Sequence, residues 1–239
     1  MTAAAFLVFA RSAGFVARAP GLSHPSVPHA VRAGFAAALA LVLAPVAARG
    51  VHVDGVAFVL ALAIEAGIGA AIGIAASILY DGAYAGGRAI DDYTGIRGSV
   101  PNAQVYAPSG FGRIWSSVFL AGFFLFGGYR LAIEAFARSF DRLPAGAVPS
   151  SHALAAYAVQ LPVSIVEAAL LVAGPPAAVA FCAQFTLGAI SRVVPRFGAF
   201  ALSFPIVFAL AVLTTAVAVP LLFGQSAVPW IRVPLLDKP

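Results

Sequence analysis

One apolar stretch, Val56 to Tyr80, limits most strongly what this chain can fold into. Glu65 is the only acidic or basic residue along it. A bilayer core is crossed by about 20 apolar residues in a helix, so the stretch predicts a membrane-spanning helix. The whole chain agrees, because 62% of its 239 residues are hydrophobic and only 10% are charged. Soluble domains carry about 25% charged residues, so the composition indicates an integral membrane protein.

Other apolar segments have the length and pattern of helices. They are Ala3–Ala19, Val31–Ala48, Ile114–Phe136, Ala153–Ile190 and Gly198–Phe223. The fourth is too long for one straight span, and we expect Pro162 to bend it and Pro175–Pro176 to break it. The sequence therefore predicts an all-α integral membrane protein with about six apolar helical segments, several short or broken. We expect a single membrane-embedded domain over residues 1–239.

The longest polar interval of the chain runs from Asp81 to Arg113. It holds six of the charged side chains, namely Asp81, Arg88, Asp91, Asp92, Arg97 and Arg113. Seven glycines and two prolines also lie in it. Glycine and proline at this density disfavour one long helix, so we expect a flexible polar loop over about residues 81–113. A flexible polar loop between membrane-type helices suits a gate or plug.

Two carboxylates, Glu65 and Glu167, interrupt apolar helices. A charge inside a membrane costs several kcal/mol, so such residues are candidates for function. The structural alternative is that each pairs with an arginine or caps a neighbouring helix. Arg11 and Arg18 are seven residues apart, so they share a helix face that should meet protein or water. Arg130 and Glu134, one turn apart, are expected to neutralise each other.

Glycines recur at four-residue spacing, as in Gly69-x-x-x-Gly73 and Gly82-x-x-x-Gly86. Helices associate in membranes through close backbone approach, which small residues at this spacing permit. The pattern predicts a tightly packed helix face, with a partner in this chain or in another one.

Several classes of function lack their sequence signatures. The only lysine is Lys238, so there is no Walker A motif, and neither HExxH nor G-x-S-x-G occurs. Cys182 is alone, and the four histidines lack HExxH spacing. His24 and His29 could share a metal with a loop neighbour, but we interpret them as solvated loop residues and expect no metal and no cofactor. The positive charges form no basic run, which argues against nucleic acid. The first residues lack a basic segment, so a cleaved signal peptide is not expected.

Several stretches, in order along the chain, resemble the FliR/SctT family of the type III protein export apparatus. The resemblance rests on five sets of residues: Arg11, Pro20, Val27-Pro28, Arg32 and Gly34; Glu65, Gly69 and Gly73; Ala85-Gly86, Ile90 and Gly95; Ser139-Phe140, Leu143-Pro144 and Gly146; and Leu187-Gly188, Arg192, Pro195, Phe200 and Phe204-Pro205. The chain departs from the family pattern at Gly87, Tyr129 and Arg196.

The resemblance implies a non-enzymatic subunit of the export gate, multi-pass in the bacterial inner membrane and in contact with lipid. FliP/SctR-like and FliQ/SctS-like subunits would build the gate with it, an FlhB/SctU-like switch protein would contact it, and unfolded protein would pass through. It leaves open whether the system is flagellar or virulence-associated. Family members are stacks of helical hairpins, in which the loop after the third long helix helps close the pore.

That loop corresponds here to about Asp91–Gly112. The pore-loop candidates are Asp91, Asp92, Tyr93, Gly95, Ile96, Arg97, Val100, Gln104, Val105 and Tyr106. The candidates for packing or intramembrane polar roles are Glu65, Gly69, Gly73, Glu167 and Arg192.

A second hypothesis is a proton-coupled small-solute transporter, with Glu65 and Glu167 as coupling sites. A third, a membrane-embedded enzyme, lacks any paired nucleophile and base.

Overall fold

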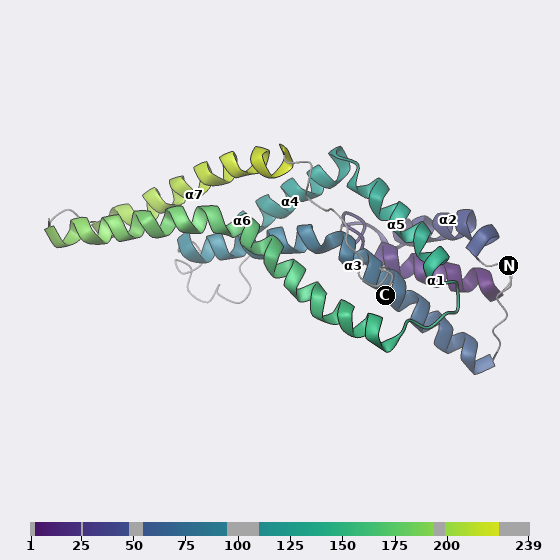
Figure 1. Cartoon of the computed structure of the whole chain (residues 1–239). Coiled ribbons are helices and arrows are strands. Elements are labelled where there is room, and N and C mark those ends of the chain that lie inside the picture. Colours follow the sequence, from purple (N-terminus) through teal and green to yellow (C-terminus); the bar gives the residue numbers. More distant parts are fainter. Residues whose placement is uncertain (1–2, 25, 48–54, 95–109, 194–198, 225–239) are drawn as a thin grey trace. The chain divides into compact units, whose positions relative to one another are not determined.

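The chain folds into helices, as the computed structural model in Figure 1 shows. The structure describes residues 3–24, 26–47, 55–94, 110–193 and 199–224. They form α1 (Ala3–Arg18), α2 (His29–Ala47), α3 (Gly55–Thr94), α4 (Gly110–Leu125), α5 (Gly128–Arg142), α6 (Ser151–Val193) and α7 (Ala199–Gly224), and no strand occurs among these residues.

Three of the described helices, α2, α3 and α6, are long and apolar enough to cross a membrane. The pair α4 and α5 adds a fourth candidate span if it counts as one segment. The predicted fold class, an all-α membrane protein, is confirmed.

The apolar segment expected as one helix at Ile114–Phe136 is two helices, α4 and α5, which meet at 71°. The chain turns at Gly127, whose φ of 76° lies in the left-handed region that other residues rarely adopt. Next to it, a Cβ added at Gly128 would lie 2.7 Å from the Phe123 ring, so the turn packs too closely for a side chain. The two glycines break the helix where hydrophobicity alone predicts continuity.

The predicted break at Pro175–Pro176 is wrong, because α6 runs without interruption from Ser151 to Val193. Each proline removes its own N–H from the helix ladder and crowds the carbonyl four residues before it, which disfavours the helix but does not have to end it. Pro176 is buried together with Val172, Ala173 and Ala180, so this side of the helix packs inside the protein. In apolar surroundings, unwinding would leave more backbone groups without hydrogen bonds, which favours keeping the helix.

The polar interval is also more helical than predicted, because α3 continues through Asp81 to Thr94 and α4 begins at Gly110. The expected loop boundaries at 81 and 113 are therefore too wide. Gly82 and Gly86 are helical because they pack against α6: added Cβ atoms would lie 3.0 Å from Ile165 O and 2.6 Å from Ala169 O. Tertiary packing here outweighs the low helix propensity of glycine.

The chain divides into two compact units, each built from segments distant in sequence. Unit 1 comprises residues 1–78 and 123–163, and unit 2 comprises residues 79–122 and 164–228. Helices α3 and α6 thus each supply residues to both units.

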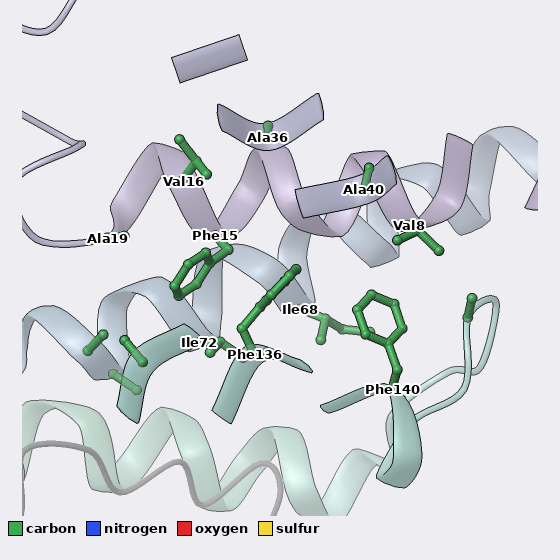
Figure 2. Packing of buried hydrophobic residues seen from close by; sticks show 14 of the residues in the cluster. Val8, Phe15, Val16, Ala19, Ala36, Ala40, Ile68, Ile72, Phe136 and Phe140 are labelled. Atoms are coloured by element: carbon green, nitrogen blue, oxygen red, sulfur yellow. The ribbon is translucent and has the colours of Figure 1, made fainter. Parts of the chain in front are cut away.

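The core of unit 1 is drawn in Figure 2, where aromatic rings of α5 meet side chains of α1 and α3. Phe136 stacks on Phe15 with ring centroids 4.7 Å apart, and Phe140 packs edge-on against Phe136 at 5.7 Å. Ala36 and Ala40 bring α2 against this core. Unit 1 is therefore a packed helical body that surrounds the buried charges described below.

Within unit 2, α3 packs against α6 through small residues, and α4 packs against α7 through aromatic rings. The Phe111 ring lies 5.8 Å from the Phe208 ring of α7, and Trp115 is fully buried.

Candidate functional site

An ion pair lies inside unit 1, between Arg11 of α1 and Glu65 of α3. Both side chains are completely buried. Arg11 Nε donates to Glu65 Oε2 at 2.5 Å, and Nη2 donates to Oε1 at 3.0 Å. This two-pronged geometry is the strongest way in which a guanidinium binds a carboxylate. The pair thus fastens α1 to α3 at one point.

Three further residues complete the site. Arg11 Nη1 donates to Ser139 Oγ at 3.1 Å, and the Ser139 hydroxyl donates in turn to Phe136 O at 2.6 Å. The Arg11 Cζ lies 4.1 Å from the centre of the Phe140 ring, close enough for a cation–π interaction. We call Arg11, Glu65, Ser139, Phe140 and Gly146 the ion-pair cluster.

Gly146 contributes through its backbone, which donates to Glu65 Oε1 at 2.7 Å. Its φ of 84° lies in the left-handed region, so glycine suits this turn after α5. Glu65 therefore accepts three hydrogen bonds, and its two oxygens are both engaged. A carboxylate held in this way is suited to joining segments, and it is poorly placed to exchange protons with a solute.

Close backbone contact between α1 and α3 continues beside the cluster. A Cβ at Gly69 would overlap the Arg11 carbonyl, and one at Gly14 would overlap the Ala66 carbonyl. A Cβ at Gly73 would lie 2.7 Å from Phe15 O. The partner of the Gly69/Gly73 face, left open by the sequence, is thus α1 of this chain.

A second polar arrangement, in unit 2, joins the last turn of α3 to the first turn of α4. The buried Asp91 carboxylate accepts a hydrogen bond from the Phe111 N–H, with Oδ1 and N 3.1 Å apart. A Cβ at Gly87 would lie 2.5 Å from the Gly112 backbone. Asp91 thus satisfies an N–H at the start of α4, as a capping residue does. We call Gly87, Asp91, Phe111 and Gly112 the loop stem.

The remaining candidates are spread over unit 2. Asp92, Tyr93, Glu167 and Arg192 are exposed. The Tyr93 carbonyl accepts a hydrogen bond from Gln184 Nε2 of α6 at 3.3 Å. The other pore-loop candidates, Gly95, Ile96, Arg97, Val100, Gln104, Val105 and Tyr106, lie outside the described residues.

The expected neutralisation of Arg130 by Glu134 is wrong. Glu134 pairs instead with Arg138, at 2.6 Å and one turn further along α5. The two candidate pairs, Arg130–Glu134 and Glu134–Arg138, have the same four-residue spacing, so the direction of the side chains decides which pair forms.

Sequence reasoning singled out Glu65, and its structural alternative, pairing with an arginine, is confirmed, but the sequence did not say which arginine. Arg11 was expected to face protein or water, and no spacing rule connects it with a carboxylate on a helix 54 residues away. The one available signal was the family resemblance. Three of its residue sets, around Arg11, Glu65 and Ser139–Gly146, meet in the ion-pair cluster.

Among the described residues, no group of three or more His, Cys, Asp or Glu side chains is placed to hold a metal ion. The fold and the site thus define a helical membrane protein with a buried ion pair between two of its helices. Comparison with known families agrees. The family described as "Bacterial export proteins, family 1" matches residues 2–228, which is nearly the whole chain. No curated protein matches the chain significantly.

The chain therefore belongs to this bacterial export family, the FliR/SctT family. It is a membrane protein of the bacterial export apparatus and associates with other components of that apparatus. The family is a structural component and not a known enzyme family.

Proposed function

We propose that this chain is a subunit of the type III export gate in the bacterial inner membrane, where it helps form and close the channel for unfolded proteins. The observation that carries the proposal is the ion-pair cluster. Three family-like residue sets from distant parts of the sequence supply its members, and all its described polar groups are paired. Such a site fixes the shape of a subunit, as an assembly component requires.

The polar interval supplies the closing element in this proposal. The loop stem holds the end of α3 against the start of α4, at the two ends of the connecting segment 95–109. A polar, glycine-rich segment held between such fixed ends would obstruct ions and small solutes and move aside for substrate.

Co-expression tests the proposal. A tagged form of this chain would be produced with FliP/SctR-like and FliQ/SctS-like subunits, extracted in detergent and weighed by native mass spectrometry. We expect a stable hetero-oligomer that contains this chain. A chain that purifies as a monomer or homodimer in the presence of those subunits contradicts the proposal.

The transporter hypothesis receives no specific support. Glu65, its leading coupling site, is fully buried and bound on both oxygens by Arg11 and Gly146. Family membership points to export instead.

A further inference from the structure

Helix α6 exposes more apolar surface than a membrane can cover. Its 43 residues correspond to about 64 Å of helix, whereas the hydrocarbon core of a bilayer is about 30 Å thick. Exposed apolar side chains occur along its whole length: Leu154, Val159, Val163, Val166, Leu170, Leu171, Phe181, Phe185, Ile190 and Val193. Lipid can cover only part of this surface, so protein must cover the rest.

Glu167 indicates which part of the α6 surface is covered by protein. Its carboxylate is exposed, and no hydrogen bond or ion pair joins it to the described residues. It lies roughly four helical turns or more from either end of α6, and its side chain is short. Arg192 differs, because it is next to the end of the helix and has a long side chain that can reach the membrane surface.

The placement of the bilayer does not remove this requirement. If lipid covers the first half of α6, the Glu167 carboxylate lies in hydrocarbon, which is costly without a partner. If lipid covers the second half, the exposed residues from Leu154 to Val166 face water. In the first case the Glu167 carboxylate needs a protein partner, and in the second the exposed apolar side chains just before it need protein cover, so both placements call for protein beside Glu167.

The local shape suits a helix as the covering element. Glu167, Leu170, Leu171 and Gly174 lie on one face of α6, since they are separated by three or four residues, and Val166 borders them. Buried Ala168, Val172 and Pro176 occupy the other side, against unit 2. A Cβ at Gly174 would meet nothing within 4 Å, so a neighbouring backbone can approach there. We call Val166, Glu167, Leu170, Leu171 and Gly174 the Glu167 patch.

We propose that the Glu167 patch is the docking surface for an apolar helix of another export-apparatus subunit, and that this helix carries an arginine or lysine opposite Glu167. The commitment to a basic partner follows from charge complementarity, because a carboxylate enclosed by an apolar interface needs a positive partner to stay ionised. The inference rests on the proposed function for the identity of the partner as a co-assembled subunit.

Charge reversal tests the patch in the co-expressed complex. We expect Glu167→Arg to lower the yield of complex at least about tenfold, because two like charges would be enclosed together. Glu167→Gln should lower it less, since an amide still accepts a hydrogen bond. The matched control is Glu134→Arg, an exposed helical carboxylate that already pairs within its own helix, and its complex should form at the wild-type yield.

A second measurement leaves Glu167 intact. A photo-reactive residue at Leu170 should form an adduct with a co-expressed subunit, at a helix that contains an arginine or lysine. Adducts with phospholipid alone, or with a second copy of this chain, would overturn the inference. So would a Glu167→Arg complex of undiminished yield, or an equal loss in Glu134→Arg. Failure of the unmodified chain to assemble would instead count against the proposed function.

Discussion

The Arg11–Glu65 pair adds little net stability, and its main effect is to hold α1 against α3. Desolvation of two charges offsets much of their attraction, but removal of one partner leaves the other charge buried and alone. The cation–π contact with Phe140 and the hydrogen bond from Gly146 add partners that are lost with the pair.

We therefore expect Glu65→Gln to lower the free energy of unfolding by about 3–5 kcal/mol, the usual cost of breaking a buried pair. Thermal unfolding of the purified chain in detergent measures this as a large drop in Tm. The Glu134→Gln control, at a largely exposed pair, should cost under about 1 kcal/mol.

The double variant Arg11→Met/Glu65→Leu should recover much of the loss, because no charge is then left unpaired. Arg11→Met and Glu65→Leu are measured singly for comparison. If the cost of the double variant equals the sum of these two single costs, the pair is not coupled and this account of the cluster is wrong.

At the scale of elements, glycines decide which helices touch. Gly14 and Gly69 let the backbones of α1 and α3 meet, and Gly82 and Gly86 do the same for α3 and α6 within unit 2. Each of these positions would otherwise direct a methyl group into a carbonyl or a side chain of the facing helix.

Gly69→Ala should separate α1 from α3 and lower Tm, because its Cβ overlaps the Arg11 carbonyl. Gly67→Ala is the matched control, on the same helix and with nothing within 4 Å of its Cβ. It should leave Tm unchanged or raise it, since alanine favours a helix over glycine by about 1 kcal/mol. An equal drop for both variants would show that helix contact is not the cause.

The loop stem makes a separate prediction. Asp91→Ala removes the acceptor for the Phe111 N–H, which should cost about 0.5–2 kcal/mol locally, as for a lost helix cap. Hydrogen exchange at the Phe111 amide should become faster. Asp91→Asn retains an acceptor oxygen and should exchange at close to the wild-type rate. Unchanged exchange in Asp91→Ala would contradict the capping role.

At the scale of the whole molecule, the exposed apolar surface and the buried ion-pair cluster have a common explanation. A subunit that must fit between lipid and other subunits keeps apolar residues outside and fixes its own shape from within. Such a subunit is what we propose for this member of the bacterial export family.

Deletion of Gly95–Tyr106 tests the proposed plug at this scale. The loop stem remains, so we expect the complex to assemble and its pore to conduct ions in the closed state. Conductance in planar bilayers measures the leak, with the full-length complex as control. Wild-type conductance of the deleted complex would count against a plug.

Much of the architecture follows from composition and periodicity alone. Hydrophobic stretches near the length of a bilayer required membrane helices, and the paucity of charge singled out Glu65 as a residue with a special environment. Four-residue glycine spacing gave the packing face at Gly69 and Gly73. These properties are local, so they can be read from neighbouring residues.

Other features depended on tertiary contacts between segments that are distant in the sequence. Glycines of the polar interval became helical because α6 packed against them, and Pro175–Pro176 did not end a helix whose surroundings disfavour free backbone groups. Arg11 became the partner of Glu65 only when α1 crossed α3. Local helix propensity disfavours a glycine by about 1 kcal/mol and a proline by about 3 kcal/mol, whereas burial and backbone pairing act on many residues together, and so the tertiary structure decided these cases.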